Sequence, residues 1–130
     1  VLTSMDEQGL RRELKIGRSL PRTVSHFARM AQRAGLQGVV ASPREISLLR
    51  RSVRGPFVIL TPGVRPAWAS QDDQKRIMTP GQAVAAGADY IVVGRPVLKA
   101  ADRRAAVEKI LEEIKGGFQP QSQRTQRKVF

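Results

Sequence analysis

The sequence predicts an α/β fold built on a parallel sheet. Three short apolar runs indicate strands: GVVAS at 38–42, FVILTPG at 57–63 and YIVVGRP at 90–96. They are rich in β-branched residues and do not alternate with polar ones, as is typical of parallel strands covered on both faces. Helical patterns separate the runs, and this alternation favours right-handed crossovers between parallel strands.

Two of the predicted helices are amphipathic. The first precedes Gly35 and carries apolar residues at three- and four-residue spacing, namely Leu20, Val24, Phe27, Ala28 and Ala31. The last ends at Gly116 and Gly117 and has the same periodicity at Val107, Ile110, Leu111 and Ile114. This spacing places the apolar residues on one stripe of a helix, where they face a core.

Two further helices are indicated by their first residues. In SPRE at 42–45, Ser42 is the expected N-cap, proline takes the first helical position, and Glu45 closes a capping box. TPGQ at 79–82 repeats this arrangement, and the helix that follows runs to Gly87. Before these helices the chain opens with VLTSM, which we interpret as the end of a strand whose beginning is missing.

Composition favours one globular domain. The chain has 130 residues, of which 41% are hydrophobic and 26% charged. No apolar run is long enough for a membrane span and no signal-peptide pattern opens the chain. The absence of cysteine excludes disulfides and thiolate sites. We therefore expect a cytoplasmic protein with no membrane partner.

The formal net charge of +12 is compatible with nucleic acid, an anionic surface or a small anionic ligand. With one Tyr and one Trp, the chain has few side chains for stacking on bases, and we expect no nucleic-acid partner. We interpret the dispersed arginines as solvated helix and turn positions: Arg11, Arg12, Arg22, Arg29, Arg33, Arg44, Arg50, Arg51, Arg54, Arg103 and Arg104.

The candidate site lies at the predicted strand ends. Gly94 and Arg95 directly follow a strand, and a glycine backbone with a guanidinium suits a phosphate. A long loop, LTPGVRPAWASQDDQKRIMTP at 60–80, follows the preceding strand, so we expect Gln74 to converge on the same anion and Arg65 to add charge. A solvated arginine after a turn glycine is the alternative interpretation of Arg95.

No other group in the sequence supports chemistry. His26 is the only histidine and falls within a predicted amphipathic helix, where we expect a surface or helix-face role. No cluster has the spacing of metal ligands, and no Ser–His–Asp arrangement is indicated. We expect neither a metal nor a cofactor.

The segment from LTPGVRP through MTPGQ to GADYIVVGRPVLKAAD resembles the C-terminal part of orotidine 5'-monophosphate decarboxylases of the bacterial type. VLTSM and GLQGVVASPRE match that family too, so the resemblance covers Val1 to about Lys115. It implies the C-terminal half of a (β/α)8 barrel, from the end of strand five through helix eight, in residues 1–117. Residues 118–130 form a basic tail, expected to be disordered.

The resemblance also implies a carboxy-lyase that converts orotidine 5'-phosphate to UMP and CO2 in pyrimidine biosynthesis, as a homodimer. Its matched Thr3 lies near the pyrimidine and ribose. The matched Arg65, Gln74, Gly94 and Arg95 bind the substrate, and Gln74 and Arg95 grip its 5'-phosphate. On this interpretation the long loop is a lid over the phosphate.

One family feature is missing from the sequence. The reaction needs an ammonium that stabilises and then protonates a carbanion, beside carboxylates, and the family supplies these from an Asp-x-Lys-x-x-Asp array. The nearest stretch here, DQK at 73–75, lacks the second Asp. We therefore expect no catalytic residue in this chain and no activity alone. The alternative is a non-catalytic phosphate- or nucleotide-binding half-barrel that self-associates to cover its open edges.

Overall fold

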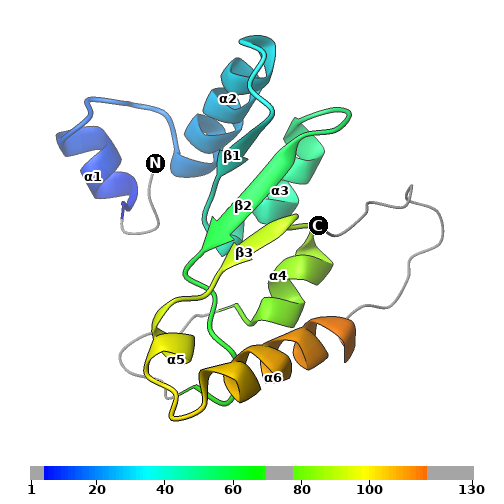
Figure 1. The fold of residues 1–130 in the computed structure, drawn as a ribbon. Helices are drawn as coiled ribbons and strands as arrows, with labels where there is room; N and C mark the ends of the chain where they lie inside the picture. Colours follow the sequence, from blue (N-terminus) through cyan, green and yellow to red (C-terminus); the bar gives the residue numbers. More distant parts are fainter. Residues whose placement is uncertain (1–4, 70–77, 117–130) are drawn as a thin grey trace.

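The computed structural model describes residues 5–69 and 78–116 (Figure 1). Within them lie one sheet and the helices around it. The elements are α1 (Glu7–Arg12), α2 (Leu20–Arg33), β1 (Gly38–Val40), the 3-10 helix η1 (Pro43–Glu45), α3 (Ile46–Ser52), β2 (Val58–Pro62), α4 (Pro80–Ala86), β3 (Tyr90–Val92), α5 (Arg95–Leu98) and α6 (Arg103–Gly116). The expected strand at the start of the chain and the basic tail fall outside these residues.

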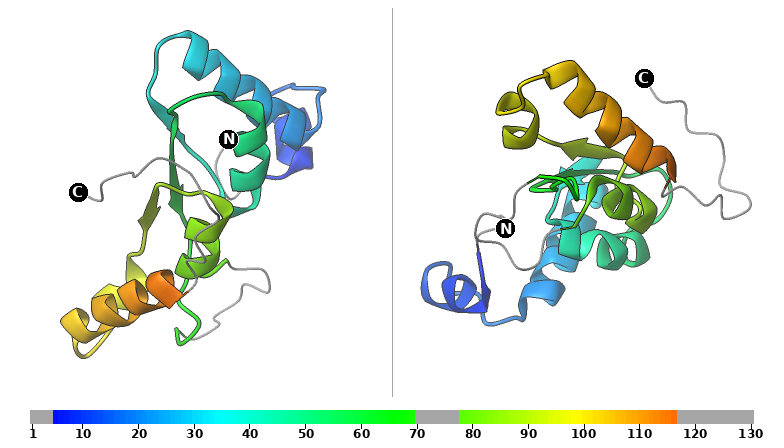
Figure 2. Two further views of the ribbon diagram at one scale, coloured as in Figure 1. Left: turned by 90° about the vertical axis from the view of Figure 1, so that its right-hand side faces the viewer. Right: turned by 90° about the horizontal axis from the view of Figure 1, so that it is seen from below.

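The described strands form one parallel sheet in the order β1-β2-β3. Val39 pairs with Ile59 and Leu60 pairs with Tyr90. Helices α2, α3 and α4 lie on one side of this sheet (Figures 1 and 2). The predicted parallel α/β arrangement is therefore confirmed, although each strand is shorter than the apolar run that indicated it.

The core lies between the sheet and these helices. Ile59 of β2 and Phe57, just before this strand, bring apolar side chains to it, and both are almost completely buried. Ile46 and Leu49 of α3 meet them, as does Ala83 of α4. Full burial of a side chain of this size contributes about 1.5–3 kcal/mol, so this small cluster supplies much of the driving force for folding.

The predicted capping residues occupy their expected positions. At α4, Thr79 Oγ1 accepts from the backbone N–H of Gln82 at 3.3 Å, and Gln82 Oε1 accepts from that of Thr79 at 3.0 Å. The helix ends at Gly87, whose φ of 112° is readily adopted by glycine. At 42–45, the Glu45 carboxylate accepts from the backbone N–H of Ser42 at 3.1 Å, but the first turn is the 3-10 helix η1, ahead of α3.

Two short helices were not predicted. Helix α1 begins after Asp6, whose carboxylate accepts from the backbone N–H of Gly9 at 2.8 Å, and it buries Leu10 completely. Helix α5 follows β3 directly and has four residues. Both helices are too short to show an apolar periodicity. The Asp6 cap marks the start of α1, and the end of β3 marks the start of α5.

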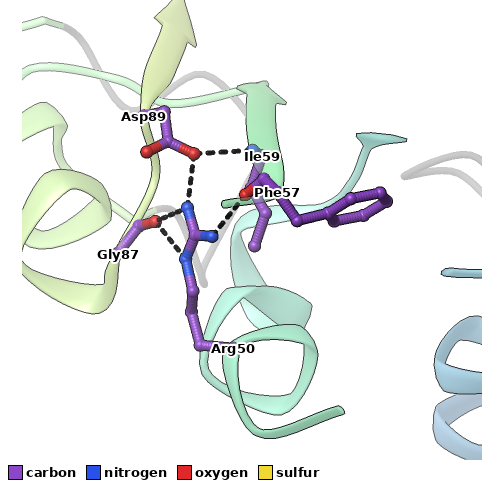
Figure 3. Close-up of polar contacts among 5 residues, drawn as sticks. All are labelled: Arg50, Phe57, Ile59, Gly87 and Asp89. Atoms are coloured by element: carbon purple, nitrogen blue, oxygen red, sulfur yellow. Dashed lines mark hydrogen bonds and ion pairs between the residues drawn. The ribbon is translucent and has the colours of Figure 1, made fainter. Parts of the chain in front are cut away.

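One arginine contradicts the prediction of solvated positions. Figure 3 shows the Arg50 side chain turned inward between three segments. Its Nε and one terminal nitrogen donate to the Gly87 carbonyl, at 2.8 and 2.6 Å. Its other terminal nitrogen donates to the Phe57 carbonyl at 2.6 Å. It also pairs with Asp89, whose carboxylate accepts from the backbone N–H of Ile59 at 2.8 Å. Arg50 therefore joins α3 to the starts of β2 and β3.

Candidate functional site

The candidate site is built where β2 and β3 end. Pro62 pairs with Val92, so the carboxyl ends of the two parallel strands lie side by side. Arg65 comes three residues after Pro62, and Arg95 comes three residues after Val92. Two of the predicted site arginines therefore follow neighbouring strand ends, the edge at which parallel α/β folds place their ligands.

The turn after β3 leaves its first residues open. Gly94 is the N-cap of α5, and its carbonyl accepts from the backbone N–H groups of Val97 and Leu98, both at 3.0 Å. A Cβ added at Gly94 would meet no atom within 4 Å, and Arg95 is exposed. The φ of Gly94 is −101°, so no left-handed conformation requires glycine here. What the turn offers is free space beside a guanidinium.

The segment after β2 is held at both ends. Gly63 has a φ of 75°, Val64 is buried, and the backbone N–H of Arg65 donates to the Met78 carbonyl at 3.2 Å. Arg65 itself is half-buried. Trp68 remains 44% exposed, and the Lys109 ammonium of α6 lies 5.9 Å from the centre of its ring. This contact places Trp68 against α6.

Other predicted residues are placed elsewhere or not described. Thr3 and Gln74 lie outside the described residues, so the convergence of Gln74 and Arg95 stays a prediction. His26 lies on α2, part-buried, with its ring 6.1 Å from that of Phe27. In residues 5–69 and 78–116, no group of His, Cys, Asp or Glu is arranged to hold a metal ion. The described part of the site places the guanidinium groups of Arg65 and Arg95 after neighbouring strand ends but offers no acid–base pair.

Sequence reasoning assigned Glu45 only a capping role, and the structure adds a second property. Glu45 follows β1 at the same edge of the sheet, and burial raises the pKa of its carboxyl above the ordinary 4.5. Its hydrogen bond from Ser42 acts in the opposite direction. An acidic residue directly after a buried run is a common capping signal, so nothing in the sequence indicated that this carboxyl is partly desolvated.

Comparison with known proteins decides the family. The sequence model of the Orotidine 5'-phosphate decarboxylase / HUMPS family matches residues 1–110. The chain belongs to this family. An orotidine 5'-phosphate decarboxylase of Heliobacterium modesticaldum is 52% identical over 118 residues, which cover 91% of this chain and 49% of the relative. One from Geobacter metallireducens is 51% identical over 117 residues, which cover 90% and 48%.

Solved structures of this family agree with the fold. The orotidine 5'-phosphate decarboxylase of Lactobacillus acidophilus superposes with a TM-score of 0.74 at 36% identity, covering 88% of this chain and 46% of that one. The enzyme of Pyrococcus horikoshii gives 0.59 at 32% identity, covering 73% and 43%. The predicted half of a (β/α)8 barrel is confirmed, since the chain spans about half the length of the relatives it matches. None of the helices in the described part of the chain is a candidate for crossing a membrane.

Proposed function

We propose that this chain is the phosphate-binding half of an orotidine 5'-phosphate decarboxylase. The supporting observation is the position of Arg65 and Arg95 after the neighbouring ends of β2 and β3, in a family named for a phosphate ester substrate. The ligand would be orotidine 5'-phosphate or UMP, within pyrimidine biosynthesis in the cytoplasm. The complete enzyme would be a homodimer.

Arg95 is the proposed main contact of the 5'-phosphate. Its planar guanidinium can donate two parallel hydrogen bonds to phosphate oxygens, and the open space at Gly94 admits the ligand to the backbone. In this proposal Gln74 donates its amide to the same phosphate, Arg65 adds positive charge from the β2 side, and Thr3 lies near the pyrimidine and ribose. Phosphate binding then fixes one end of the nucleotide.

The chain would contribute binding energy and no proton transfer. Loss of CO2 leaves a carbanion, which needs an ammonium close by to stabilise and then protonate it. The sequence has no Asp-x-Lys-x-x-Asp array to supply that group. Binding of a remote phosphate still assists a complete enzyme, because its energy can be used to order the reacting end of the substrate.

Calorimetric titration of the chain with UMP and with uridine tests this proposal. We expect tighter binding of UMP, and we expect Arg95→Ala to weaken UMP binding at least tenfold, about 1.4 kcal/mol, while uridine binding stays the same. Arg33→Ala, an exposed arginine at the end of α2, is the matched control and should change neither. An equal loss for uridine and UMP would rule out the phosphate role of Arg95.

The same phosphate-binding residues would also serve a second function, a non-catalytic half-barrel that binds nucleotides. Both functions predict that the isolated chain forms no UMP from orotidine 5'-phosphate. Clear turnover by the chain alone would show that the argument about the missing centre is wrong. Turnover that appears only with a chain carrying the array would favour the enzyme half over the non-catalytic binder.

A further inference from the structure

The side of α2 that faces away from the core is basic. Arg22 and Arg29 lie seven residues apart, which is about two helical turns, so they share one side of the helix. Arg18 precedes the helix and lies beside them. The apolar stripe of the same helix, with Val24 and Ala28, is buried in the core. The three arginines therefore gather on the outer side of α2.

A pocket of about 410 Å³ opens at these arginines, and we call it the basic pocket. Its lining includes Arg18, Arg22, Arg29, Ser25 and His26, together with Leu48 of α3. Ser25 is buried, and its hydroxyl oxygen lies 3.0 Å from that of Ser52 on α3. Ser52 also donates to the Leu48 carbonyl at 2.8 Å. These contacts join α2 to α3, so the fold itself holds the floor of the basic pocket in place.

The positive charge of the basic pocket is not balanced by nearby acids. Its three arginines are exposed, and in the part of the chain that the structure describes none of them forms an ion pair. The sequence has no acidic residue from Leu14 to Arg44. One carboxylate, that of Glu7, accepts from the backbone N–H of Leu20 at the start of α2, at 3.4 Å. An anion bound among the arginines would relieve the repulsion between them.

We propose that the basic pocket binds a small polyphosphate, a chain of linked phosphates either free or carried by a nucleoside. Each guanidinium can donate two hydrogen bonds to one phosphate group. Arg22 and Arg29 are separated by about 10 Å along the helix axis, so linked phosphates fit this spacing better than a single phosphate does. The His26 imidazole adds at least one N–H donor in either protonation state. The volume of the pocket lies within the range of about 300–1,000 Å³ that is usual for small-molecule sites.

The basic pocket is separate from Arg95. Helix α2 packs beside β1, whereas Arg95 follows β3, and β2 lies between these two strands. Helix α2 lies at the top of Figure 1 and α5 near the bottom, and the two views of Figure 2 also place them apart. The proposal therefore does not depend on the phosphate role proposed for Arg95.

Calorimetric titration of the Arg95→Ala chain with inorganic tripolyphosphate tests the proposal, because Arg95 cannot then supply the binding. We expect a single site that weakens as salt is added. Orthophosphate should bind at least tenfold more weakly, since it reaches fewer of the arginines. Titration with ATP distinguishes the two sources of the phosphate chain. Equal affinity for ATP and tripolyphosphate indicates that the chain alone is bound, and tighter binding of ATP indicates that the nucleoside is bound too.

Two double variants in the Arg95→Ala chain make the test specific. Arg22→Gln with Arg29→Gln should weaken tripolyphosphate binding at least tenfold. Arg103→Gln with Arg104→Gln is the matched control, because it removes the same two charges from exposed positions on α6. The control should bind tripolyphosphate as tightly as its parent. All four arginines are exposed, so the circular dichroism of both variants should stay the same.

Three outcomes would overturn the proposal. The first is the absence of tripolyphosphate binding. The second is an equal loss of affinity in the two double variants, which would assign the binding to net charge and not to the pocket. The third is a short single-stranded RNA that binds more tightly than tripolyphosphate and displaces it, which would make nucleic acid the occupant.

Discussion

Replacing Arg50 by methionine should destabilise the fold strongly. The side chain makes contacts with two carbonyl groups and with the Asp89 carboxylate, and the side chains of Arg50 and Asp89 are only 16% and 15% exposed. Removing one partner of a buried ion pair costs about 3–5 kcal/mol. Because both groups keep some contact with solvent, we expect the lower end, a loss of about 3 kcal/mol in the free energy of unfolding.

Urea unfolding followed by circular dichroism measures this loss. For a slope of about 2 kcal/mol per molar urea, the transition midpoint should fall by about 1.5 M. The midpoint of Arg50→Lys should lie between those of the unchanged chain and of Arg50→Met, because an ammonium keeps the charge but not the planar set of donors. Arg104→Met is the control, since the Arg104–Glu108 pair has side chains that are 90% and 59% exposed and such pairs contribute little. The reasoning fails if Arg50→Met costs less than about 1 kcal/mol or no more than Arg104→Met does.

Two further substitutions test buried polar groups. Burial raises the pKa of Glu45, so the folded chain holds that proton more tightly and the free energy of unfolding falls as pH rises above 4.5. Glu45→Gln should flatten this slope in urea titrations up to neutral pH, and an unchanged slope would contradict the assignment. The Thr61 hydroxyl is buried without a hydrogen-bond partner among the described residues, so Thr61→Val should raise the unfolding free energy by about 1 kcal/mol. A lower melting temperature for this variant would contradict it.

The elements of the fold were largely predictable because their signals are local. A strand covered on both faces leaves a continuous apolar run, and a capping box needs residues only three apart, as at Thr79 and Gln82. Strand ends were less predictable. The apolar run from Tyr90 continues to Val93, but the ladder to β2 ends at Val92, because strand length depends on the partner strand.

The Arg50 contacts could not be predicted from local sequence. Their partners Gly87 and Asp89 are 37 and 39 residues away, and a helical arginine followed by another arginine has the same pattern as a solvated one. The same limit explains Phe27, which belongs to the apolar stripe of α2 yet is 41% exposed. Periodicity indicates which face of a helix is apolar, but not whether the surface that should cover it is present.

For the candidate site, the strand-end rule placed Gly94, Arg95 and Arg65 correctly with respect to the sheet. The register of β2 and β3 brings the strand ends that precede these residues side by side. The same rule cannot give the position of a residue in the middle of a long loop, because no ladder fixes it. The contact between Gln74 and a phosphate, and the place of Thr3, therefore remain predictions.

Because the backbone N–H of Arg65 donates to the Met78 carbonyl, the residue at which the chain leaves β2 lies next to the residue at which it approaches α4. The number of residues between Arg65 and Met78 can then change without displacing β2 or α4, since doubling the length of a loop costs only about 0.6 kcal/mol of closure free energy. A fluorescent or affinity peptide inserted between Trp68 and Met78 would therefore be tolerated by the fold.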